Sequence, residues 1–168
     1  TDSFPGIMAV IEMPDIGLEE VVNDQNIICL DNIKDPGNLG TIIRSADWFG
    51  INNLILSPDC VDIYNPKVVR SSMGSLFRVN IFKSSDFVQT LNKLKEKYKL
   101  AGLVIDGENI QKIDKKNKTA YIFGSESHGL NKEVEKLLDK RYTIKGKGQA
   151  ESLNVAVATG ILLNKITD

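Results

Sequence analysis

The chain has 168 residues, of which 42% are hydrophobic and 26% charged, and its formal net charge at pH 7 is −1. This balance suits one globular domain with its own core, and the near-neutral charge argues against tight, sequence-independent binding of a phosphate backbone by this chain alone. The single histidine, and two cysteines without C-x-x-C spacing, argue against a zinc site, and no apolar run approaches the ~20 residues of a membrane-spanning helix.

Short β-branched runs alternate along the chain with segments of helical spacing. The expected strands cover residues 7–11, 27–30, 54–56, 79–82, 103–105, 120–123 and 142–144. The expected helices cover residues 39–49, 66–76, 87–98, 132–138 and 153–166, and residues 13–22 are expected to form a loop or a short acidic helix. This alternation predicts an α/β fold with a mostly parallel sheet and helices on both faces. Cys29 and Cys60 lie in apolar stretches, which favours reduced core thiols and a cytoplasmic protein.

Three segments that follow expected strands are rich in glycine and polar residues, and ligands of open α/β sheets bind at the carboxyl ends of the strands. These segments are residues 31–40, with Arg44 shortly after them, residues 123–130, and residues 144–158. We therefore expect the functional residues to lie in these three segments.

Standard nucleotide and hydrolase motifs do not fit these segments. Gly124 and Gly129 have the spacing of a P-loop, but Leu130 replaces the required lysine. A dinucleotide fingerprint begins at residues 146–148 but lacks its third small residue and a following βαβ unit. A Ser-His-Asp hydrolase that uses His128 is disfavoured, because a nucleophile elbow needs glycine two residues before its serine and Ser125 stands there before Ser127.

Taken together, the three segments resemble the motifs of the SpoU (also called TrmH) branch of the SPOUT RNA methyltransferases. Asn38 with Arg44 resembles the first motif, the G-x-E-x-x-G sequence of residues 124–129 the second, and Glu-Ser-Leu-Asn-Val-Ala-Val-Ala at residues 151–158 the third. The resemblance covers residues 26–166 and implies a C-terminal trefoil knot, a homodimer, S-adenosyl-L-methionine as the cofactor and no metal. The implied reaction is methylation of a ribose 2′-hydroxyl in structured RNA.

The resemblance also implies which residues carry the chemistry. The expected catalytic residues are Asn38, Arg44, Glu126, Ser152 and Asn154. The expected cofactor-binding residues are Gly124, Gly129, Ile144, Ser152 and Leu153, and the expected RNA-binding residues are Arg70, Lys145 and Lys147. Because the pKa of arginine lies above ~12, we expect Arg44 to orient the hydroxyl or stabilise the developing alkoxide more readily than to act as a base.

Structural interpretations of the same residues stay open. Asn38 and Ser152 each precede a helical run and could be helix N-caps. Arg44 could be a surface residue paired with Asp47, although Trp48 and its apolar neighbours suggest a largely buried helix. Glu126 could be a helix-start carboxylate instead of a partner that holds Asn38 or Arg44. Ile144 and Leu153 could simply pack in the core.

The N-terminal part of the chain is interpreted separately. Residues 1–25 are expected to form a strand and a loop at the end of a linker from an RNA-binding domain, and residues 26–168 the methyltransferase domain of one globular unit. Larger family members with such a domain often act on ribosomal RNA, which favours ribosomal RNA over transfer RNA as the substrate. The alternatives are a tRNA 2′-O-methyltransferase, a catalytically silent RNA-binding paralogue, and a nucleotide-dependent α/β enzyme of doubly wound type.

Overall fold

The computed structural model of the protein describes residue 6 and residues 10–23, 26–125 and 129–168. Its strands form a six-stranded sheet in the order β3-β2-β1-β5-β4-β6. All neighbouring strands run parallel, which confirms the predicted α/β class. The strands are β1 (Ile27–Leu30), β2 (Asn53–Leu56), β3 (Asn80–Lys83), β4 (Lys99–Asn109), β5 (Thr119–Phe123) and β6 (Lys140–Thr143).

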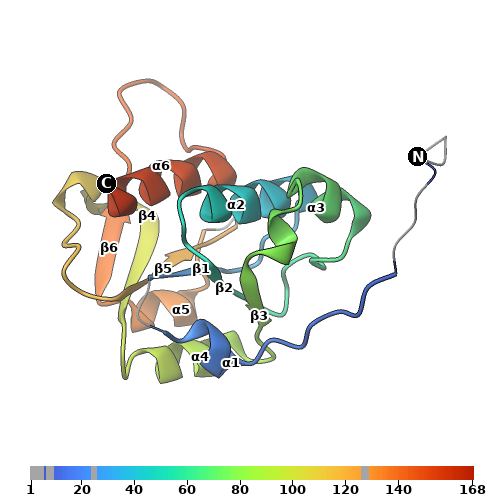
Figure 1. Ribbon diagram of the computed structural model, residues 1–168. Coiled ribbons are helices and arrows are strands. Elements are labelled where there is room, and N and C mark those ends of the chain that lie inside the picture. Colours follow the sequence, from blue (N-terminus) through green and yellow to red (C-terminus); the bar gives the residue numbers. More distant parts are fainter. Residues whose placement is uncertain (1–5, 7–9, 24–25, 126–128) are drawn as a thin grey trace.

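Helices cover both faces of this sheet, as the alternating pattern predicts (Figure 1). One face carries α2 (Pro36–Trp48), α3 (Pro66–Ser71) and α6 (Val155–Thr167), together with the 3-10 helix η1 (Ser75–Phe77). The other face carries α1 (Leu18–Val21), α4 (Phe87–Leu94) and α5 (Lys132–Leu137). A second 3-10 helix, η2 (Ile110–Lys112), follows β4.

The central strands are apolar at every position because both of their faces are covered. In β1, Ile28 and Leu30 pack into the core beneath α2 and α6, whereas Ile27 and Cys29 pack into the core on the opposite face. Side chains of a strand alternate between the faces of a sheet, so one four-residue strand contributes to both cores. Both cysteines are buried and free, as expected for core thiols.

Several predicted element boundaries are wrong for identifiable reasons. The helix predicted over residues 66–76 ends at Ser71, because Met73 (φ 50°) and Gly74 (φ 84°) have left-handed backbone conformations that no α-helix continues. The strand predicted over residues 103–105 extends over all of β4. Residues 7–9 of the first predicted strand lie outside the described residues, and Val10 and Ile11 are exposed and belong to no strand.

Candidate functional site

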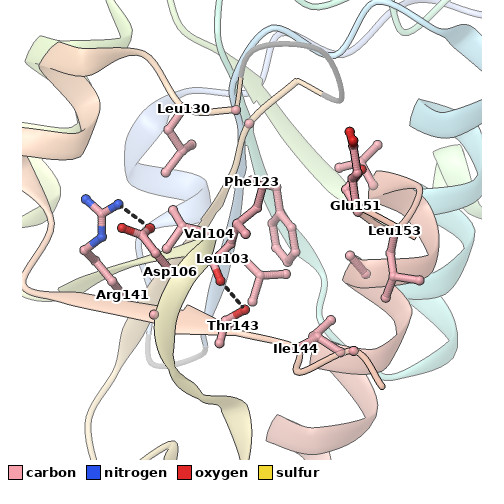
Figure 2. Close-up of a pocket in the computed structure, with 18 of the residues that line it drawn as sticks. Leu103, Val104, Asp106, Phe123, Leu130, Arg141, Thr143, Ile144, Glu151 and Leu153 are labelled. Carbon is pink, nitrogen blue, oxygen red and sulfur yellow. Dashed lines mark hydrogen bonds and ion pairs between the residues drawn. The ribbon is translucent and has the colours of Figure 1, made fainter. Parts of the chain in front are cut away.

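A cavity of about 860 Å³ opens at the carboxyl ends of β4, β5 and β6, the edge at which parallel sheets place their ligands (Figure 2). Three stretches of chain form its walls. They are the end of β4 near Asp106, the residues that follow β5 from Gly124, and the residues between β6 and α6, from Ile144 to Leu153. The second and third walls carry the predicted cofactor-binding residues Gly124, Gly129, Ile144, Ser152 and Leu153, which the fold brings together.

The first wall is a bulge in β4 that the sequence analysis missed. Leu103 and Glu108 both pair with Tyr142, so residues 104–107 stand out from the ladder. Two side chains of β6 hold this bulge: the Thr143 hydroxyl donates to the Ile105 carbonyl at 2.9 Å, and Arg141 Nη2 donates to Asp106 Oδ1 at 2.8 Å. Figure 2 shows both contacts beside the cavity. The bulge therefore has a defined shape although it lies outside the regular ladder.

The second wall requires glycine at its first position. A Cβ atom on Gly124 would lie 2.2 Å from the backbone carbonyl carbon of Gly129, which is a severe clash. The amide of Ser125 donates to the Gly129 carbonyl at 3.0 Å, and the Gly129 amide donates back to the Ser125 carbonyl at 2.9 Å. The two limbs of this loop are thus paired directly beside the cavity. Glu126, a predicted catalytic residue, lies outside the described residues, as does His128.

Apolar residues line the cavity on more than one of its walls. Ile105 is 79% exposed and Leu153 is 47% exposed, and both line the cavity together with Ile144. Figure 2 shows Asp106 and Arg141 on one side of the cavity and Leu153 on the other. Exposed apolar side chains combined with exposed backbone groups suit a flat heterocycle that needs both apolar contacts and hydrogen bonds.

Two asparagines join the first and third motif segments. Asn154 Nδ2 donates to Asn38 Oδ1 at 3.0 Å, and Asn154 is flanked by Leu153 and Val155 of the cavity wall. The N-cap interpretations of Asn38 and Ser152 are both wrong. Asp35 caps α2 by accepting the Asn38 amide, and Asn154 caps α6 by accepting the amides of Ala156 and Val157. The side chains of Asn38 and Asn154 therefore meet at the edge of the cavity.

Arg44 lies on the exposed side of α2 and is not among the residues that line the cavity of its own chain. Its proposed partner Asp47 instead accepts hydrogen bonds from the Arg78 guanidinium, at 2.7 and 2.9 Å, and this contact lowers the pKa of Asp47. Trp48 is 83% exposed, so the expectation that this helix is buried on most sides is wrong. Arg44 and Trp48 are four residues apart and share one solvent-facing side of α2.

Charged groups are distributed unevenly around the cavity. Arg141 contacts both Asp106 (2.8 Å) and Glu135 (3.3 Å), and its guanidinium lowers the pKa of Asp106. Lys145, which follows β6, is exposed and lines the cavity. Lys147 and Arg70 are exposed as well. The described residues contain no group of three or more His, Cys, Asp and Glu side chains that could hold a metal ion. Nor do they contain a helix long and apolar enough to cross a membrane.

Comparison with known proteins gives consistent matches. The profile of the SpoU rRNA Methylase family matches residues 25–164. An uncharacterised tRNA/rRNA methyltransferase of Synechocystis is 35% identical over 94% of this chain and 58% of its own length. The 23S rRNA (guanosine(2553)-2′-O)-methyltransferase RlmP of Bacillus subtilis is 34% identical over 97% of this chain and 65% of its own length.

The fold has a similar counterpart among solved structures. The SpoU methyltransferase AviRb of Streptomyces viridochromogenes, solved in complex with AdoMet, superposes with a TM-score of 0.87 at 31% identity. The match covers 93% of this chain and 65% of AviRb. This chain thus spans less than two thirds of the length of each of these relatives.

Proposed function

The chain belongs to the SpoU rRNA methylase family, and we propose that it transfers a methyl group from S-adenosyl-L-methionine to a ribose 2′-hydroxyl of RNA. One observation carries the proposal: the second and third motif segments form the walls of one cavity, and the Asn38–Asn154 hydrogen bond joins the first motif segment to its edge. Relatives named as 2′-O-methyltransferases of 23S rRNA support this reaction, and the AdoMet complex of AviRb supports the cofactor.

The cavity fits an adenosyl group by its chemistry. Gly124, Gly129 and Ser152 would contribute backbone groups, and Ile144 and Leu153 would contribute apolar contact. Bound S-adenosylmethionine supplies an electrophilic methyl group on a sulfonium. The chain's own residues then need to align the accepting oxygen with that methyl group and to exclude competing water.

The alignment is assigned to the polar residues at the cavity edge. The amides of Asn38 and Asn154 are proposed to position the ribose, with Ser152 beside them, and Glu126 is proposed to hold this group in place. Arg44 is proposed to orient the hydroxyl and stabilise its developing negative charge, because a guanidinium remains protonated at neutral pH.

We infer that the active form is a homodimer with a knotted C-terminal part, as the family resemblance implies. Arg44 is exposed and does not line the cavity of its own chain, so a second copy would allow it to approach the site of a partner. The proposed interface lies over α2 and α6, which pack against each other, and α6 exposes Val157 (51%) and Ile161 (38%). A cytoplasmic location follows from the proposed substrate.

Ribosomal RNA is the proposed substrate, because RlmP and a similar methyltransferase of Streptomyces viridochromogenes are both named for 23S rRNA. With a net charge of −1, the chain is proposed to contact phosphates locally through Arg70, Lys145 and Lys147, not over its whole surface. We therefore expect it to bind the cofactor well and to methylate RNA slowly on its own.

The test is transfer of labelled methyl from S-adenosylmethionine to purified ribosomal RNA and transfer RNA, with methylated positions mapped by resistance to alkaline cleavage. Arg44→Ala should lower the transfer rate at least ~100-fold, the range found when a group that stabilises developing charge is lost. The control, Lys83→Ala, removes an exposed cation at the edge strand β3, far from the cavity in sheet order, and should leave the rate unchanged.

Three results would contradict the proposal. Label on base nitrogens instead of ribose would exclude 2′-O-methylation. Binding of cofactor and RNA without any transfer would indicate the silent paralogue. A thermal shift with NAD or ATP, and none with S-adenosylhomocysteine, would indicate a different nucleotide-dependent enzyme.

A further inference from the structure

A buried carboxylate next to the cavity has no assigned role in the reaction. Asp31 directly follows β1 and is 8% exposed. Its amide donates to the Phe123 carbonyl at 2.8 Å, and its carboxylate Oδ2 accepts the backbone amide of Asn131 at 3.1 Å. Phe123 and Asn131 stand immediately before and after residues 124–130, so a single residue contacts both ends of the second cavity wall.

The contact at the far end is long-range. Asp31 and Asn131 are 100 positions apart in the chain, and Asn131 is also the N-cap of α5. The near end is fixed in any case by the β1–β5 ladder, in which Leu30 pairs with Phe123. The Asp31 carboxylate is therefore the group that ties the returning limb, Gly129 to Asn131, to the sheet. That limb is paired with the outgoing limb at Ser125 and Gly129, so fixing it fixes both lining limbs.

Burying a carboxylate costs free energy unless hydrogen bonds compensate. Burial raises the pKa of Asp31, the nearby Asp59 raises it further, and the Asn131 amide and the Ser57 hydroxyl lower it. An apolar side chain would avoid this cost but could not accept the Asn131 amide. The hydrogen bond that the Asp31 carboxylate accepts from the Asn131 amide accounts for a buried acid at this position.

We propose that Asp31 is a positioning residue that holds the two described limbs of the second cavity wall, residues 124–125 and 129–130, in the shape that binds the cofactor. The proposal rests on the function proposed above. It also links two motif segments, because the chain continues from Asp31 through Asn32, whose amide donates to Ser57 Oγ at 2.9 Å, into the turn that carries Asn38. Asp31 touches neither the cofactor nor the ribose, and it acts through the loop.

The first experiment compares Asp31→Ala, Asp31→Asn and Ser57→Ala by calorimetric titration with S-adenosylhomocysteine. Asp31→Ala should weaken binding about tenfold, which corresponds to the loss of one hydrogen bond to a charged group. Asp31→Asn should stay within about threefold of the wild type, because its amide oxygen can accept the same N–H. Ser57→Ala removes the hydroxyl that lowers the pKa of Asp31 and accepts the Asn32 amide, but it leaves the Asp31–Asn131 hydrogen bond in place, so it should weaken binding less than Asp31→Ala does. In turnover, Asp31→Ala should raise KM for S-adenosylmethionine about tenfold and leave kcat within about threefold.

A second pair of variants removes the donor instead of the acceptor. Asn131 has φ −60°, which proline adopts, so Asn131→Pro deletes the amide hydrogen while keeping this φ. Asn131→Ala loses the same capping side chain but keeps the amide, and serves as its control. Asn131→Pro should weaken S-adenosylhomocysteine binding more than Asn131→Ala does, and adding Asp31→Ala should weaken it no further.

Hydrogen exchange in the unliganded chain separates this proposal from the proposed function. Asp31→Ala should speed exchange of the Ser125 and Gly129 amides, and Asp31→Asn should not, whatever ligand the cavity takes. Failure of the wild type to bind S-adenosylhomocysteine would count against the proposed function alone. Unchanged binding or exchange in Asp31→Ala, or an Asp31→Asn variant as impaired as Asp31→Ala, would overturn the role of Asp31.

Discussion

Gly124 shows how a single missing side chain shapes the cavity. A methyl group at this position would meet the Gly129 backbone at 2.2 Å. We expect Gly124→Ala to lower the free energy of unfolding by about 1–3 kcal/mol, as overpacking does, and to weaken S-adenosylhomocysteine binding at least ~30-fold because the two limbs must separate. Chemical denaturation and calorimetric titration measure the two effects.

The matched control is Gly160→Ala in α6, where an added Cβ meets nothing within 4 Å. Alanine is the better helix former, so this change should raise the free energy of unfolding by about 0.5–1 kcal/mol. Equal losses of binding in both glycine variants would show that Gly124 has no special role in the cavity.

Asp31 predicts a pH dependence whose sign follows from its environment. Burial raises the pKa of the folded state above that of the unfolded chain, so the folded state holds the proton more tightly. Its contribution to stability is therefore greatest below the unfolded pKa and is lost as the pH rises through the folded pKa. Asp31→Asn should raise Tm at pH 7 by about 2 °C relative to the wild type, and this difference should vanish below pH 3.8, the ordinary pKa of aspartate. A gain in Tm that is equal at both pH values would contradict this assignment.

Residues of the site were predictable where they belong to a sequence motif, but not where their role depends on a contact with a residue far away in the sequence. Gly124, Ile144, Ser152 and Leu153 were named from the family resemblance, and they line one cavity. Asp31 lies in the first predicted segment but was given no role, and the Arg141–Asp106 pair was missed, because their contacts span 100 and 35 positions and no spacing rule connects such residues. To predict that Asp31 is buried, one would have to know that the chain brings Asn131 back to the end of β1.

Among the elements, α6 begins with a cap that also belongs to the site. Asn154→Ala should lower the free energy of unfolding by about 1 kcal/mol, the usual cost of an N-cap, and should also break the contact with Asn38. Asp86→Ala removes the equivalent cap of α4 and should cost the same stability. We expect methyl transfer to fall at least ~10-fold in Asn154→Ala and to stay unchanged in Asp86→Ala. Parallel losses in both variants would assign Asn154 a capping role only.

Element prediction succeeded where burial is complete and failed where backbone geometry decides. The predicted bounds of β1 agree with the structure, because four consecutive apolar residues fill a strand that is covered on both faces. The end of α3 was placed too late, because the pattern of apolar and polar residues gives no sign of the left-handed conformation of Met73. The extent of β4 was underestimated because its second half is polar and interrupted by the bulge at residues 104–107.

At the scale of the whole molecule, the proposed dimer can be followed with the only tryptophan of the chain. Trp48 is 83% exposed in the single chain and lies on the same side of α2 as Arg44. If α2 and α6 form the interface, Trp48 emission should shift to shorter wavelength as protein concentration rises, in step with dimer formation in analytical ultracentrifugation. Val157→Glu, on the exposed side of α6, should abolish both the emission shift and the dimer. A dimer whose tryptophan emission equals that of the monomer would place the interface elsewhere.

The apolar walls of the cavity have a thermodynamic consequence. Ile105 and Leu153 line two walls of the cavity and expose hydrocarbon to water, and an adenosyl group that contacts both walls would cover them. Removing apolar surface from water lowers the heat capacity, so the binding enthalpy should become more negative on warming from 10 to 35 °C. Ile105→Ser should reduce the change of the binding enthalpy with temperature. An enthalpy that does not change with temperature in the wild type would mean that the ligand leaves these apolar residues in contact with water. Temperature would thus tune how strongly this chain retains a charged, water-soluble cofactor through hydrocarbon contacts of its cavity.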